Sequence, residues 1–195
     1  MRYDTPSYTV ESVTSGHPDK ICDQISDAAV DACLKEDPRS RVAVEAFGSH
    51  GLLVVGGEVT SSAQVDYEAL ARKVYKDIGY DDDLRVITNV VQQSPDIAQG
   101  VDTGGAGDQG IMYGFATDDT PEFLPSALVN VHKLARGLER LRREDKANFW
   151  WLKPDGKTQL TVENGIVKTA LVSCQHTDNI EQEEIKRAIT RYLIE

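Results

Sequence analysis

Pro18-Asp-Lys-Ile-Cys-Asp-Gln-Ile-Ser-Asp-Ala-Ala-Val-Asp-Ala-Cys-Leu-Lys-Glu36 is the stretch from which the fold can be worked outward. Its apolar residues recur at helical spacing and form one face, namely Ile21, Ile25, Ala28, Ala29 and Ala32. Proline suits the first position of a helix, where a missing N–H costs nothing, and Pro38 stops the pattern. The stretch therefore predicts one amphipathic helix over residues 18–36.

Strands flank this helix, and a second helix follows. Residues 7–13 read as a short strand before it. The elements expected after it are strands near 41–47 and 52–60 that turn at 48–51, a helix over about 62–78, and a strand near 84–92. Ser61 and Gln64 are spaced as a capping box for the second helix, and Gly79 provides its C-terminal stop.

The second half repeats this order. The elements expected there are a strand near 111–116, a helix over about 122–143, strands near 158–163 and 166–175, and a helix over about 180–194. Asn164-Gly165 is a strong signal for a two-residue hairpin turn. Both halves read β-α-β-β-α, and the first half has a further strand that the second lacks. We expect an α+β fold of repeated units, with mixed or antiparallel sheets and helices on one face, divided at 1–103 and 104–195.

Composition narrows the class of protein. The 195 residues are 40% hydrophobic, which is enough for a core, and the first ten residues are polar, unlike a signal peptide. No apolar run approaches the ~18 residues of a membrane span, and three cysteines without a C-x-x-C pair favour neither disulfides nor zinc. The net charge of −11 argues against nucleic acid as a partner, and the basic residues of 133–146 fit a solvated helix face. We therefore expect a soluble, cytoplasmic protein.

Gly16-His17-Pro18-Asp19-Lys20 places a glycine, an imidazole and a carboxylate at the start of the first helix. Free N–H groups and the helix dipole favour phosphate there, histidine can donate to phosphate oxygens, and aspartate can bind Mg²⁺. Taken alone, the string is better explained structurally, with Asp19 stabilising the first turn and His17 capping it.

Two further stretches look like loops that carry function. Gly105-Ala-Gly-Asp-Gln-Gly110 has the letters of a dinucleotide fingerprint, but a predicted strand follows it where the fingerprint requires a helix. Residues 92–102 are polar and contain the breakers Pro95 and Gly100, so the whole connection suits a lid or binding loop. Lys153-Pro-Asp-Gly-Lys157 reads as a type I or II turn that presents a carboxylate beside an ammonium group.

Each string alone is weak, but in this order they are not. Five of them carry the argument: residues 12–27 around Gly-His-Pro-Asp-Lys, Gly56-Gly-Glu-Val-Thr60, Gln93-Ser-Pro-Asp-Ile-Ala-Gln-Gly100, Gly105-Ala-Gly-Asp-Gln-Gly110 and Lys153-Pro-Asp-Gly-Lys-Thr-Gln159. Together they resemble the methionine adenosyltransferase (S-adenosylmethionine synthase) family over essentially the whole chain. The resemblance implies synthesis of S-adenosylmethionine from ATP and L-methionine, with Mg²⁺ and K⁺ as cofactors. It also implies a homodimer or higher homo-oligomer whose active sites lie between subunits.

The resemblance also implies roles for residues by position. His17 and Lys157 would be catalytic. The residues implied for ATP are His17, Asp155, Gly156 and Lys157. Those implied for methionine are Glu58, Gln93 and Asp108, and those implied for metals are Asp19 and Glu11 for Mg²⁺ and Glu45 for K⁺. The loop from Gln93 to about Asp102 would be a mobile lid.

Some features depart from the family pattern. The lid is a few residues shorter than usual, Asp81-Asp-Asp-Leu-Arg85 replaces a usual Gly-Phe-Asp segment, and Lys153 stands where arginine is usual. Nothing matches the family's last third, which holds basic segments around the triphosphate. In the implied reaction the methionine sulfur attacks C5′ of ATP without a general base, and tripolyphosphate leaves with about four negative charges to be stabilised. We therefore expect this chain alone to be inactive. It is either part of a complete enzyme that needs a C-terminal partner segment, or a non-catalytic homologue that binds or modulates a full-length synthase.

Overall fold

A computed structural model describes residues 6–102, 104–106 and 109–194. The chain forms two compact units. One contains the chain up to His17 together with the chain from Phe115 onward, and the other is Pro18–Gly114. The α+β class predicted from the sequence is confirmed, and each unit has one three-stranded sheet.

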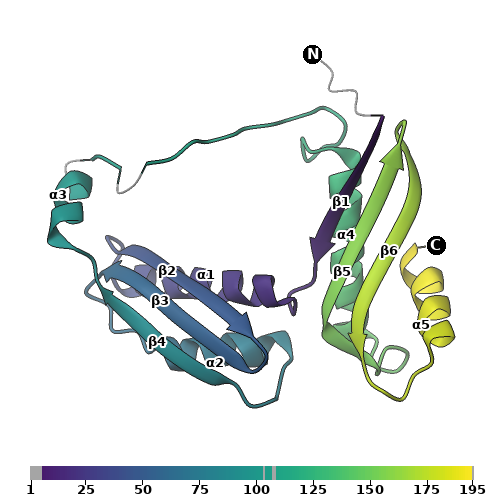
Figure 1. The fold of residues 1–195 in the computed structure, drawn as a ribbon, viewed down its shortest axis with the longest axis horizontal. Coiled ribbons are helices and arrows are strands. Elements are labelled where there is room, and N and C mark those ends of the chain that lie inside the picture. Colours follow the sequence, from purple (N-terminus) through teal and green to yellow (C-terminus); the bar gives the residue numbers. More distant parts are fainter. Residues whose placement is uncertain (1–5, 103, 107–108, 195) are drawn as a thin grey trace. The chain divides into compact units, whose positions relative to one another are not determined.

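The Pro18–Gly114 unit is a mixed sheet covered by two helices (Figure 1). Its elements are α1 (Pro18–Glu36), β2 (Arg41–Ser49), β3 (Leu52–Thr60), α2 (Tyr67–Ile78), β4 (Arg85–Gln92) and α3 (Pro95–Asp102). The sheet order is β2-β3-β4, with β2 antiparallel to β3 and β3 parallel to β4. Ile25 and Ala29 of α1, Val55 of β3 and Ala71 of α2 are at most 1% exposed and form the centre of the core.

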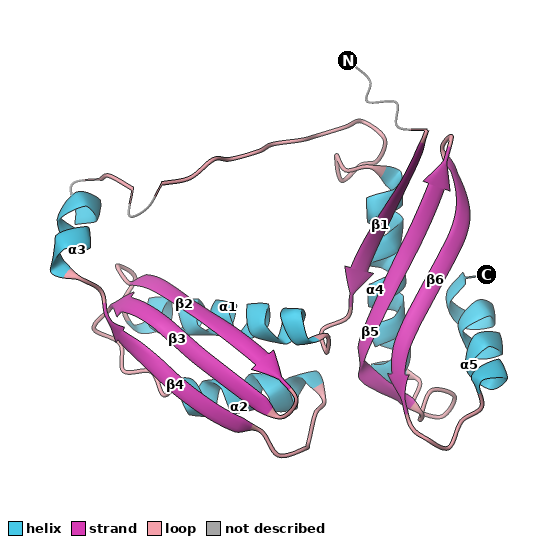
Figure 2. Ribbon diagram, in the orientation of Figure 1, coloured by secondary structure: helices cyan, strands magenta, loops and turns pink. Residues whose placement is uncertain are grey.

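The second unit contains an antiparallel sheet (Figure 2). Its elements are β1 (Ser7–Val13), α4 (Ser126–Glu144), β5 (Leu152–Glu163), β6 (Ile166–His176), α5 (Gln182–Ile189) and a π-helical turn, Thr190–Ile194. The sheet order is β1-β5-β6, and α4 packs across β1 and β5. Its core is built around Leu138, Phe149 and Trp151. Thr158, fully buried in β5, donates its hydroxyl to the Val131 carbonyl of α4 at 2.9 Å.

Several elements match the predictions residue for residue. The first strand and the first helix begin and end as expected, and Asn164 and Gly165 both have positive φ, of 50° and 77°, as the hairpin turn requires. The second helix was predicted wrongly at its start. It begins at Tyr67, because the Asp66 carboxylate accepts the Ala69 N–H at 2.9 Å and caps it there.

Three other expectations were wrong. Residues 111–116 form no strand, and Ile111, Met112 and Tyr113 are more than four-fifths exposed. A strand needs a partner, and the place beside β5 is taken by β1, which pairs with it from Ser7↔Glu163 to Val13↔Lys157. Lys153–Lys157 is no turn but the beginning of β5. The connection after β4 includes α3, whereas we expected a loop without secondary structure.

The β1–β5 pairing also shows that the two sheets do not follow the two halves of the chain. β1 precedes α1 in sequence but completes the sheet of the later half. The division at 1–103 and 104–195 stays a prediction. Among the described residues, no helix has the length and apolar character needed to cross a membrane.

Candidate functional site

The site is built around a turn that links β1 to α1. The His17 N–H donates to the Thr14 carbonyl at 3.2 Å, so Thr14–His17 is a closed four-residue turn. Thr14 is buried, and both its backbone and its side chain are hydrogen-bonded to β5. Its N–H donates to the Gly156 carbonyl at 2.9 Å, and its hydroxyl donates to the Pro154 carbonyl at 2.7 Å.

Gly16 lets this turn approach β5 closely. A methyl group on Gly16 would lie 2.3 Å from the Pro154 carbonyl carbon, a separation that no real side chain shows. A larger residue would therefore push the turn away from β5. The short Gly-His string thus has a packing reason for its glycine, independent of any ligand.

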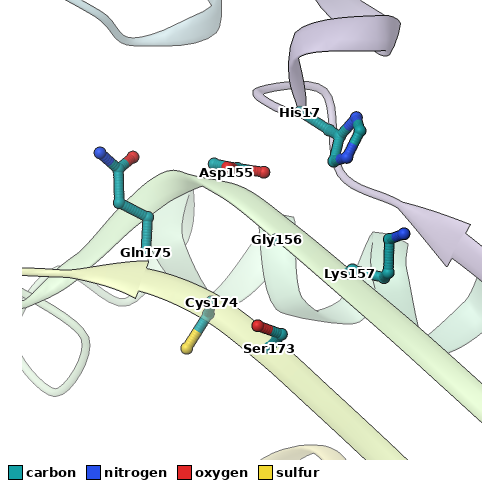
Figure 3. Close-up of a pocket in the computed structure, with 7 residues that line it drawn as sticks. All are labelled: His17, Asp155, Gly156, Lys157, Ser173, Cys174 and Gln175. Carbon is teal, nitrogen blue, oxygen red and sulfur yellow. The ribbon is translucent and has the colours of Figure 1, made fainter.

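His17 comes to lie beside the start of β5, over a hollow of about 200 Å³ (Figure 3). The hollow is lined by His17, Asp155, Gly156, Lys157, Ser173, Cys174 and Gln175. Along β5 the even-numbered residues around it are buried, so Asp155 and Lys157 point outward from the core. The structure therefore brings together the four residues that the sequence assigned to ATP.

The charges around the hollow are mixed. Burial raises the pKa of the Asp155 carboxyl, while His17, the Gly156 N–H and Lys157 act in the opposite direction. The Lys157 ammonium lies 3.3 Å from a Glu11 carboxylate oxygen, and both side chains are partly exposed. A pair this accessible to water contributes at most about 1 kcal/mol, so an incoming anion could replace Glu11 on Lys157.

β6 adds residues that the sequence analysis missed. Ser173 lies directly opposite Lys157 in the antiparallel pair, and Gln175 is on the same face two residues along. The Asn164-Gly165 turn alone could not have found them, because its register would place Val172 opposite Lys157. An irregularity in the pairing between Thr161 and Val162 shifts the register by one residue and brings Ser173 there instead. Cys174 points to the core side, and burial raises the pKa of its thiol to about 11. It is therefore a protonated packing residue at neutral pH.

The other predicted residues belong to the Pro18–Gly114 unit. Asp19 is exposed in the first turn of α1. Glu45 on β2 and Glu58 on β3 share the face of the sheet that the helices leave open, because Glu45 pairs with Gly56 and Glu58 with Ala43. Gln93, just after β4, accepts from Arg41 Nε at 3.2 Å and from the Thr60 hydroxyl at 3.3 Å. Asp108 lies outside the described residues.

Comparison with known proteins adds the decisive observation. Residues 5–97 match the model of the S-adenosylmethionine synthetase N-terminal domain, and residues 103–195 match that of the central domain. The chain belongs to the S-adenosylmethionine synthetase family.

Curated relatives named S-adenosylmethionine synthase agree with this assignment. The chain is 46% identical to the one from Prochlorococcus marinus (strain NATL2A). The match covers 95% of this chain and 52% of the relative. The chain is also 45% identical to that of Sorangium cellulosum, covering 49% of it, and 45% identical to that of Mesoplasma florum, covering 52%. The chain thus spans about half the length of the curated relatives it matches.

The resemblance of this chain to the synthetase family assigned metal ions to the carboxylates of Asp19, Glu11 and Glu45, and the structure shows what surrounds them. In the part of the chain that the structure describes, no group of three or more His, Cys, Asp or Glu side chains is gathered as a metal cage. Mg²⁺ is commonly held by one or two carboxylates together with substrate phosphates and water. Exposed carboxylates such as Asp19 and Glu11 fit that mode of binding, in which the nucleotide supplies the remaining oxygens.

Proposed function

We propose that this chain takes part in the synthesis of S-adenosylmethionine from ATP and L-methionine, as a portion of a complete enzyme. The observation that carries the proposal is the hollow in which His17 is held over Asp155, Gly156 and Lys157. The turn and β5 are joined by the Thr14 and Gly16 contacts, which hold the backbone of His17 beside β5. This is the preorganisation that phosphate recognition needs.

In the proposed reaction the methionine sulfur attacks C5′ of ATP and displaces tripolyphosphate. Water then hydrolyses the tripolyphosphate to pyrophosphate and phosphate. A thioether carries no proton, so no side chain is required as a base. His17 and Lys157 would donate to the phosphate oxygens of the leaving group. Asp155 and Gly156 would hold the nucleotide beside them.

Methionine would be held by residues of the other unit, with Glu58 and Asp108 facing its ammonium group and Gln93 beside them. These carboxylates suit a cation and repel phosphate, so they would keep the two substrates in their own subsites. Gln93 is already oriented by Arg41 and Thr60, which leaves its amide N–H₂ group available to donate.

Mg²⁺, held by Asp19 and also Glu11, would neutralise phosphate charge when bound, and Glu45 would hold K⁺. Both are proposals that rest on the position of these residues in the family pattern. The chain's net charge of −11 gives a physical reason for bound cations, since an acidic protein repels a polyphosphate.

A test of the function uses the full product of the gene and the Asp19→Asn variant. We expect the wild-type protein to form S-adenosylmethionine, and the variant to need more Mg²⁺ and to turn over more slowly at saturating Mg²⁺. Asp27→Asn, on the same helix but eight residues further on, is the matched control. Unchanged Mg²⁺ dependence in Asp19→Asn would remove Asp19 from the metal site. Absence of the reaction from the wild-type protein would favour a non-catalytic role that binds or modulates a full-length synthase.

We also propose that the protein forms a homodimer through the open face of the β2-β3-β4 sheet. Phe47, Ile87 and Val91 are 65%, 40% and 51% exposed on that face, an unusual grouping for a surface in water. Phe47→Lys should therefore shift the protein toward the monomer, by tenfold or more in dissociation constant, when measured by analytical ultracentrifugation. Phe123→Lys, which changes an equally exposed aromatic residue elsewhere, should leave the dimer intact. If both variants sediment like the wild type, this face is not the interface.

A further inference from the structure

We infer that Glu139 on α4 is a positioning residue, which sets the place of His17 through Ser15. The inference rests on the proposed role of His17 toward phosphate. It assigns a function to a helix residue that lies outside the strings quoted for the family resemblance.

The contact is direct and uses both oxygens of the carboxylate. Glu139 Oε2 accepts the Ser15 N–H at 3.1 Å, and Glu139 Oε1 accepts the Ser15 hydroxyl at 2.5 Å. Ser15 is the second residue of the Thr14–His17 turn. Two bonds from one side chain to one residue fix both the position and the orientation of that part of the turn.

Glu139 is itself held from the other side. Arg143 Nε donates to Oε1 at 2.8 Å, and an Arg142 nitrogen lies 3.4 Å from the same oxygen. The Glu139 side chain is 21% exposed. Burial raises the pKa of this carboxyl, but the bonds from Ser15 and Arg143 outweigh it, so the pKa lies below its usual range. The group is therefore charged at neutral pH.

A partly buried carboxylate beside a turn proposed to bind phosphate calls for an explanation. Its charge works against an anionic ligand, and its desolvation costs free energy. The two arginines offset that charge, and what remains is a rigid link from α4 to the turn. With Thr14 tied to β5 and Gly16 seated against Pro154, three successive residues before His17 are each anchored. The anchor that Glu139 supplies comes from α4 and not from β5.

The experiment compares Glu139→Ala, Glu139→Gln and Ser15→Ala with the control Glu144→Gln, an exposed glutamate at the end of the same helix. The first readout is hydrogen exchange in the full protein, which does not depend on activity. Glu139→Ala should speed exchange at residues 14–17 about tenfold or more and leave β2, β3 and β4 unchanged. The control should match the wild type.

The second readout is the reaction. Glu139→Ala should lower kcat about 10- to 100-fold, since small displacements of a catalytic group are costly, with KM for methionine within about twofold. Glu139→Gln should recover most of the loss, because its amide oxygen still accepts the Ser15 N–H. Adding Ser15→Ala to Glu139→Ala should cost little more, as expected for partners in one contact.

The outcomes separate this inference from the function on which it rests. Wild-type exchange at residues 14–17 in Glu139→Ala would overturn it. So would a loss of activity explained by a smaller folded fraction, with normal kcat in the molecules that remain folded. If the wild-type protein makes no S-adenosylmethionine, or His17→Ala does not slow it, the proposed function fails. The exchange measurement then still decides whether Glu139 positions the turn.

Discussion

The 195-residue polypeptide assayed alone is expected to release no measurable S-adenosylmethionine from ATP, methionine, Mg²⁺ and K⁺. Among the described residues that line the hollow, Lys157 is the single permanent cation, and it is paired with Glu11. The leaving group carries about four negative charges, and each missing donor is worth about 3 kcal/mol. Loss of a few such donors lowers the rate by many powers of ten.

The measurement follows S-adenosylmethionine and phosphate release after circular dichroism has shown that the polypeptide is folded. A matched arm adds the C-terminal half of a relative, such as the Prochlorococcus marinus synthase, in trans or by fusion. We expect activity to return in that arm and to fall again when Asp19→Asn is introduced. Clear turnover by the polypeptide alone, lost in Asp19→Asn, would contradict the prediction and show that the necessary cations come from other residues of the chain.

His17→Ala is expected to lower kcat of the active protein by about 10²–10³-fold, as removal of one donor to a developing negative charge does elsewhere. Folding should change little, because Thr14, Ser15 and Gly16 each anchor the turn and are unchanged in this variant. The measurement is kcat, normalised to the folded fraction from thermal denaturation.

His50→Asn is the control for this variant. His50 lies in the exposed β2–β3 turn with φ 45°, a backbone conformation that asparagine tolerates. It should keep wild-type kcat. A His17→Ala protein that loses stability but turns over normally per folded molecule would assign His17 the capping role that the isolated string also allows.

Most local structure could be predicted from the sequence. Helix α1 was predicted to the residue, since Pro18 and Pro38 bound a run whose apolar residues recur every three or four positions. The β5–β6 hairpin followed from Asn164-Gly165, because few other residues adopt positive φ at two successive positions. The family followed from strings whose order is more specific than any one of them.

What the sequence left open was the pairing of distant segments. The strand β1 was recognised from its residues, but alternation of apolar and polar residues states only that a strand has two faces. Its partner β5 lies more than a hundred residues away in the sequence. Which strand pairs with which depends on the packing of the whole unit, and local sequence does not contain that information. For the same reason the apolar stretch 111–116 was predicted as a strand, although no edge receives it.

The site shows the same division. His17 and Lys157 were predicted as site residues from the family resemblance of the strings that contain them, since each string alone is weak. Their meeting was decided by the tertiary structure, through the Thr14 bonds to β5 and the space that Gly16 leaves beside Pro154. The Ser15–Glu139 contact spans 124 residues of sequence. A bond of that kind depends on the packing of α4 against β1 and β5, because this packing brings its two distant partners within reach of each other.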